Sequence, residues 1–67
     1  MPVITFEGEI LTREQKTALI RSLTRTASES TGVPERFFSV VLHEQPAENL
    51  GFGGETVEEL KARLHQK

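Results

Sequence analysis

The chain has 67 residues, a net charge of −2 at pH 7 with histidine neutral, and no cysteine. Its eight basic residues are dispersed, which argues against a nucleic-acid or anionic-membrane surface, and the lack of cysteine excludes disulfides, thiolate metal sites and a cysteine nucleophile. A single domain over residues 1–67 buries only about 60% of the surface of its unfolded chain, so we expect oligomerisation to stabilise it.

Pro2 follows the initiator methionine and opens an extended run, Val3–Glu7, that Gly8 ends. Removal of Met1 would leave a secondary amine at the start of this predicted strand. An α-amino group titrates close to neutral pH, and partial burial or neighbouring cations lower its pKa further. The Pro2 amine is therefore a candidate general base. The alternative is that proline is only tolerated here, as the first residue of an edge strand.

A long helix is predicted next. Thr12 and Gln15 fit a capping box, in which each side chain bonds the backbone N–H of the other residue. Gly32 and the following Val33-Pro34 end the helix, because the residue before proline avoids the helical region; residues 34–36 then form one turn. Spacings of three and four predict one apolar stripe on an otherwise solvated helix, made of Lys16, Leu19, Ile20, Leu23, Ala27 and Thr31.

Phe37–Glu44 is the second predicted strand, and both of its faces are largely apolar. Strands buried on two sides are typical of parallel sheets, and two strands joined by a helix form a right-handed β-α-β unit. Two strands and one helix leave an apolar face uncovered, so a second copy is expected to pack there. The two faces are Phe38, Val40 and Leu42, and Phe37, Ser39, Val41 and His43.

The segment Gln45–Glu55 is rich in turn residues, with glycines at 51, 53 and 54. It lacks the lysine and hydroxyl of a phosphate-binding loop and does not follow the first strand, so we interpret it as a hairpin or bulge. Leu50 and Phe52 are expected to face a neighbouring apolar surface. A short helix over Thr56–Leu64 follows, with Val57, Leu60 and Leu64 on one face.

Several other functions have no support in the sequence. His43 and His65 have no partners at metal-ligand spacing, and the paired Glu58-Glu59 is most simply a solvated helix face. No metal or cofactor is therefore expected. The start of the chain has no basic region, and no stretch approaches the roughly 20 apolar residues that cross a bilayer, so we expect no membrane partner and a cytoplasmic location.

The order and spacing of four features resemble the 4-oxalocrotonate tautomerase family over the whole chain. These are Pro2 at the start of a strand, Glu14-Gln15-Lys16 at the helix entry, a long amphipathic helix ending before Pro34, and the segment Leu50-Gly51-Phe52-Gly53-Gly54-Glu55. The resemblance implies an α+β fold, with a parallel β-α-β unit, a C-terminal hairpin and short helix, and completion by oligomerisation into a homohexamer built as a trimer of β-α-β dimers. It also implies an isomerase whose amino-terminal proline shuttles a proton between carbons of an enol or dienol acid.

Three positions of that family's site differ here. The family's best-known members have one arginine before the long helix, one early in the second strand and an aromatic residue before the Gly-x-Gly-Gly segment; these positions are Leu11, Ser39 and Leu50. Loss of both arginines removes bidentate carboxylate recognition, which makes a dicarboxylate substrate doubtful. Arg13 is near the first position and is a candidate replacement. The pattern is closer to a divergent subgroup than to the founding member.

The sequence thus predicts a cofactor-independent tautomerase acting on a small enol or oxo carboxylic acid, with Pro2 as general base and then acid. One alternative is that Pro2 forms an iminium with a carbonyl or supports hydratase or dehalogenase-type chemistry on an unsaturated acid. Another is a non-catalytic binding or assembly subunit that needs a second chain carrying the arginines.

Overall fold

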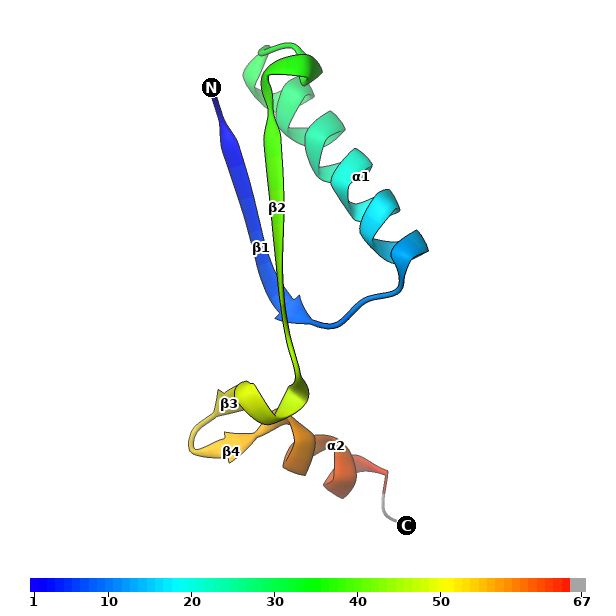
Figure 1. The fold of residues 1–67 in the computed structure, drawn as a ribbon. Helices are drawn as coiled ribbons and strands as arrows, with labels where there is room; N and C mark the ends of the chain where they lie inside the picture. The colour runs from blue at the N-terminus through cyan, green and yellow to red at the C-terminus, as the bar shows by residue number, and fades with distance from the viewer. Residues whose placement is uncertain (66–67) are drawn as a thin grey trace.

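The computed structural model describes residues 1–65, and its fold is α+β. Strands β1 (Val3–Glu9) and β2 (Ser39–Gln45) form a parallel sheet, and helix α1 (Arg13–Thr31) crosses between them and covers one face (Figure 1). The 3₁₀ turn η1 (Glu35–Phe37) links α1 to β2. Beyond β2 the chain forms a second, smaller unit at the far end of the molecule. Its elements are the 3₁₀ turn η2 (Ala47–Asn49), strands β3 (Gly51–Phe52) and β4 (Glu55–Thr56), and helix α2 (Val57–Leu64).

The parallel pairing confirms the predicted sheet, but the strand bounds differ from prediction. The register runs from Val3 opposite Ser39 to Glu9 opposite Gln45. Gly8 lies inside β1 and does not end it, because it pairs with the partner strand like its neighbours. The predicted start of β2 at Phe37 is wrong, because Phe37 completes the η1 turn; the first strand residue is Ser39.

Helix α1 begins and ends as predicted. The Thr12 hydroxyl accepts from the Gln15 N–H at 3.1 Å, and the Gln15 side-chain oxygen accepts from the Thr12 N–H at 2.9 Å. Gly32 ends the helix with φ 79°, in the left-handed region where glycine costs least. Of the predicted stripe, Ile20 and Thr31 are exposed. A single chain offers only two strands for α1 to rest on, so one flank of the stripe has nothing to pack against.

The C-terminal segment forms the predicted hairpin. Strands β3 and β4 pair antiparallel, and Gly53 and Gly54 make the turn with φ 57° and 90°. Helix α2 begins with its own capping box, in which the Thr56 hydroxyl accepts from the Glu59 N–H at 3.0 Å. The Val57 N–H donates to the Leu50 carbonyl at 2.8 Å, which ties the helix back to the segment before the hairpin.

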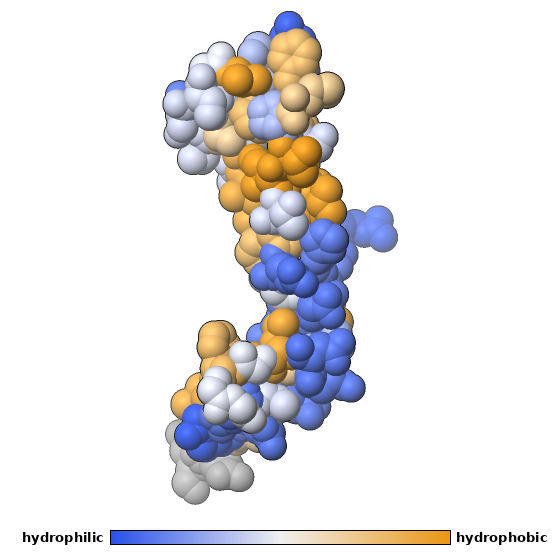
Figure 2. All heavy atoms as spheres, turned by 90° about the vertical axis from the view of Figure 1, so that its left-hand side faces the viewer, coloured by the Kyte–Doolittle hydropathy of each residue, from blue (hydrophilic) through white to orange (hydrophobic). Residues whose placement is uncertain are grey.

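The chain encloses almost no core. Among residues 1–65 only Val57 is buried, whereas Val3, Phe52 and Leu64 are each more than 60% exposed. The accessible surface is 5321 Å² and the chain extends 47 Å along its longest axis, whereas a compact monomer of 7.5 kDa exposes about 4,200 Å². Hydrophobic side chains gather both on the β-α-β unit and on the C-terminal unit (Figure 2). Within the described range, no helix has the length and apolar character needed to span a membrane.

Candidate active site

Pro2 lies where both strands of the sheet begin. Its carbonyl accepts a hydrogen bond from the Ser39 N–H at 3.0 Å, and the next residue, Val3, pairs with Ser39 in the register. Pro2 is half-buried, whereas Met1 is 91% exposed. While Met1 is attached, the Pro2 nitrogen belongs to a tertiary amide and has no N–H. The structure therefore brings two of the predicted site residues, Pro2 and Ser39, together and fixes the backbone of both.

The turn that precedes β2 lies at this same end of the sheet, close to the N-terminus (Figure 1). The N–H groups of Phe37 and Phe38 donate to the carbonyls of Pro34 and Glu35, each at 3.1 Å. Within this turn the guanidinium carbon of Arg36 lies 4.7 Å from the centroid of the Phe37 ring, a cation–π arrangement. Arg36 is not among the residues predicted for the site, although its position three residues before Ser39 and beside two phenylalanines is visible in the sequence.

The opposite end of the sheet is held together by Glu44. One carboxylate oxygen accepts from the Leu11 N–H at 2.8 Å, and the other accepts from the Lys16 ammonium at 3.1 Å. The Leu11 N–H and then Lys16 stabilise the ionised form, so the pKa of Glu44 is lowered from its ordinary value. Glu44 thus anchors the loop before α1 to the end of β2.

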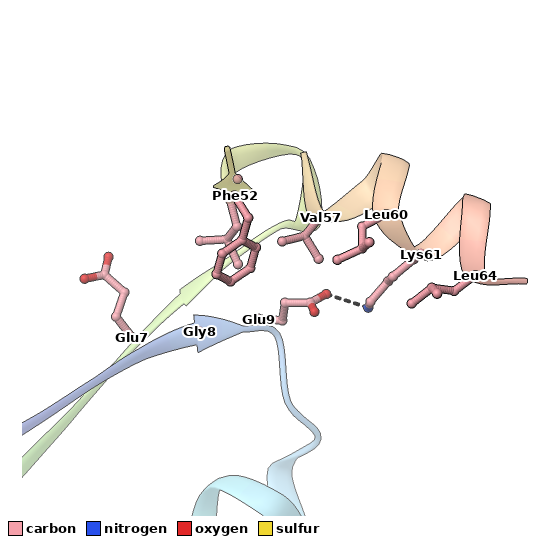
Figure 3. Close-up of a pocket in the computed structure, with 10 residues that line it drawn as sticks. Glu7, Gly8, Glu9, Phe52, Val57, Leu60, Lys61 and Leu64 are labelled. Carbon is pink, nitrogen blue, oxygen red and sulfur yellow. Dashed lines mark hydrogen bonds and ion pairs between the residues drawn. The ribbon is translucent and has the colours of Figure 1, made fainter. Parts of the chain in front are cut away.

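A groove of about 520 Å³ separates the end of β1 from the C-terminal unit. Figure 3 shows Phe52, Val57, Leu60 and Leu64 turned towards Gly8 and Glu9 of β1. Leu50 also lines this groove. The Lys61 ammonium lies 2.6 Å from a carboxylate oxygen of Glu9, so an ion pair bridges the two walls. Apart from this ion pair and Glu7, the side chains that line the groove are apolar.

The predicted site residues therefore fall into two groups within one chain. Pro2 and Ser39 lie where the strands begin, whereas Leu11, Arg13 and Leu50 lie where they finish. The seven residues of β1 separate the two groups, and a strand of this length spans roughly 20 Å. A pocket that contains both groups cannot form within one chain of this shape.

Residues 1–65 contain no group of three or more histidine, aspartate or glutamate side chains placed to hold a metal ion. Two acidic side chains, Glu44 and Glu59, accept hydrogen bonds from the backbone and stabilise the fold. Glu44 holds the loop before α1. Glu59 caps α2: its carboxylate accepts from the Thr56 N–H at 2.9 Å, and this bond, followed by the Thr56 side chain, lowers the pKa of the Glu59 carboxyl.

Comparisons with known proteins agree with this fold and its motifs. The family model described as tautomerase enzyme matches residues 2–60. The 2-hydroxymuconate tautomerase of Comamonas testosteroni is 40% identical over 47 residues, which is 70% of this chain and 75% of that protein. The structure of TomN, a 4-oxalocrotonate tautomerase homologue in the tomaymycin biosynthetic pathway, has a TM-score of 0.87 at 31% identity, covering 91% of this chain and 95% of TomN.

A second similar structure comes from an analysis of trans-3-chloroacrylic acid dehalogenase activity. It has a TM-score of 0.75 at 36% identity and covers 82% of this chain and 97% of its own. The family match spans Pro2 and the strand that follows it, the long helix and the hairpin, which are the features that carried the sequence resemblance. This chain belongs to the 4-oxalocrotonate tautomerase family.

Proposed function

We propose that this protein is a cofactor-independent tautomerase whose base is the Pro2 amine, set free by removal of Met1. The neutral amine takes the proton from the enol oxygen of a small carboxylic acid, and the resulting ammonium returns a proton to carbon to give the keto form. Family membership supports the reaction class. The observation that carries the role of Pro2 is the hydrogen bond from Ser39 to its carbonyl.

That hydrogen bond matters because a chain terminus normally frays. Pairing with β2 holds the Pro2 carbonyl, and the proline ring restricts the remaining rotation next to the nitrogen. An amine fixed in this way stays in one position relative to a bound substrate. A positioned acid–base group typically contributes about 10²- to 10⁴-fold to the rate.

The proposed substrate carries a single carboxylate. Ser39, the residue hydrogen-bonded to Pro2, has a short neutral side chain and cannot form the paired N–H bonds that an arginine makes with a carboxylate. At the other end, the Leu11 N–H is already committed to Glu44 at 2.8 Å. Turnover of dicarboxylates is therefore expected to be slower than turnover of phenylenolpyruvate, which has a single carboxylate.

We further propose that the working enzyme is a homo-oligomer, a hexamer by family resemblance, whose site draws on more than one copy. The surface in excess of a compact monomer is about 1,100 Å², and a standard interface buries about 800 Å² per partner. Two sheets that run in opposite directions would bring Leu11 and Leu50 of one copy towards Pro2 of the other.

A second candidate reaction is hydration or dehalogenation of an unsaturated acid. It is favoured by the 36% identity to the chain studied for trans-3-chloroacrylic acid dehalogenase activity. Here the protonated Pro2 would give its proton to one alkene carbon while water adds to the other, and a chlorinated adduct would then lose chloride and a proton. Release of chloride from 3-chloroacrylate, absent in Pro2→Ala, distinguishes this reaction from tautomerisation.

The proposed function is tested by Pro2→Ala in Met-free protein. The variant keeps an amine, but it is a primary amine that is less well fixed, so we expect a loss of about tenfold or more in the rate of phenylenolpyruvate tautomerisation. Thr17→Ala, on the exposed side of α1, is the matched control and should retain full activity. Equal activity in Pro2→Ala and the wild type would exclude Pro2 as the base, and no activity in either protein would favour the non-catalytic alternative.

A further inference from the structure

The cations of this chain are divided unequally between the two ends of the sheet. Lys16, Lys61 and Arg63 form ion pairs with Glu44, Glu9 and Glu55 at distances of 2.6 to 3.1 Å. Among residues 1–65, four arginines form no ion pair with another described residue: Arg13, Arg21, Arg25 and Arg36. Three of these lie on α1. Only Arg36 lies in the turn that leads into the strand beside Pro2.

The backbone places Arg36 close to Pro2. Ser39 follows Arg36 by three positions, a stretch that spans at most about 11 Å, and the Ser39 N–H donates to the Pro2 carbonyl at 3.0 Å. The turn that carries Arg36 is itself closed by two backbone hydrogen bonds. Arg36 is therefore presented from a fixed turn next to the proposed base.

The side chain of Arg36 is also held in a form suited to an anion. Its guanidinium carbon lies over the Phe37 ring, 4.7 Å from the ring centroid. None of the ion pairs of residues 1–65 uses the N–H groups of Arg36, so they can donate to an anion. An arginine that is already held against a ring loses less rotamer freedom when a carboxylate binds.

We propose that Arg36 binds the carboxylate of the substrate whose proton Pro2 transfers, in place of the side chain that Ser39 does not provide. This inference rests on the proposed function. The two carboxylate oxygens accept parallel N–H bonds from one edge of the guanidinium. A single arginine binds one carboxylate in this way, which agrees with the proposed preference for substrates with one carboxylate.

The test measures binding of an inert carboxylate, cinnamate, and its neutral amide, cinnamamide, to Met-free protein by calorimetry. Arg36→Gln should weaken cinnamate binding about tenfold and leave cinnamamide binding unchanged, because a charge-assisted bond is lost only for the anion. Arg36→Lys should recover part of the loss. Arg25→Gln, which removes an exposed cation of α1, should leave the affinity for both ligands unchanged.

Three outcomes would overturn the proposal: wild-type protein that binds cinnamate no more tightly than cinnamamide, an Arg36→Gln variant with unchanged cinnamate affinity, or equal loss for both ligands in a variant whose circular dichroism is unchanged. Turnover separates this failure from failure of the proposed function. If Pro2 is not the base, proline-dependent turnover is absent while cinnamate binding still requires Arg36. If Arg36 is not the anion site, proline-dependent turnover remains and its KM is unaffected by Arg36→Gln.

Discussion

The two ends of the parallel sheet use their charged side chains differently. Where β1 and β2 finish, Glu44 accepts from the Leu11 N–H and pairs with Lys16, and Lys61 reaches Glu9. Where the strands begin, Pro2 is held by a backbone hydrogen bond, and Arg36 has no ion-pair partner in the described part of the chain. Charges at the finishing end neutralise one another and fix the loops.

This difference indicates which end of the sheet supports the fold and which end is available for the proposed reaction. A carboxylate with two donors, like Glu44, is satisfied and has little capacity for a ligand. Arg36 lies against a ring and forms no ion pair within residues 1–65, so its N–H donors stay available, and an amine at the start of a strand keeps its proton-accepting capacity once Met1 is removed. The beginning of the sheet is therefore the better candidate for proton transfer, and the finishing end for support and for contact with another copy.

The largest predicted effect comes from a charge in the groove at the finishing end. Phe52 is 72% exposed in the single chain and lines that groove, so Phe52→Asp should remove an apolar contact that only a second copy can complete. We expect loss of the oligomer and of cooperative folding at micromolar concentration, measured by sedimentation velocity and circular dichroism.

Thr26→Asp adds the same charge on the exposed side of α1 and should leave assembly intact. A wild-type chain that persists on dilution as a cooperatively folded monomer would remove the physical argument for oligomerisation.

A smaller effect is expected from adding a cation where the strands begin. Ser39→Arg places a guanidinium beside Pro2, and the second carboxylate of 2-hydroxymuconate then gains a charge-assisted partner. We expect kcat/KM for 2-hydroxymuconate to rise about tenfold relative to that for phenylenolpyruvate. Similar wild-type values for the two substrates would indicate that another cation, such as Arg13, already binds the second carboxylate.

The smallest predicted effect is the pH dependence of the stability that Glu44 contributes. Its pKa is lower in the folded chain than its ordinary value of 4.5, so it adds stability above that pH, and this contribution is lost as the pH falls through the lowered pKa. Glu44→Gln should therefore be less stable than the wild type at pH 7, with the difference in melting temperature shrinking below about pH 4.5. A difference that stays constant down to pH 3 would show that the carboxylate charge is not what matters.

Much of the fold could be predicted because its signals are local. The capping box at Thr12, the glycine at 32 and the glycines of the hairpin each act over a few residues, and all three appear in the structure. The strand bounds were less predictable. Phe37 is a residue type that favours strands, but here it closes a 3₁₀ turn. Glycine usually indicates the end of a strand, but here Gly8 continues β1 because it pairs with Glu44 of β2.

The candidate site was predictable only in part. The position of Pro2 follows from the sequence, and its closeness to Ser39 follows from parallel pairing. The bond from Leu11 to Glu44 joins residues 33 apart, and no local pattern signals it. In the proposed oligomer, the distance between the two groups of site residues depends on how copies of the chain assemble, so neither the sequence pattern nor one folded chain determines it.

The central claim is that the free nitrogen of Pro2 is the base, and the most direct test compares two forms of the same chain. Protein that retains Met1 and protein that lacks it are separated, verified by intact mass, and assayed for tautomerisation of phenylenolpyruvate. In the Met1-retaining form the Pro2 nitrogen is a tertiary amide without an N–H or a basic lone pair. We predict activity in the Met-free form and essentially none in the Met1-retaining form; equal activity in both would contradict the proline mechanism.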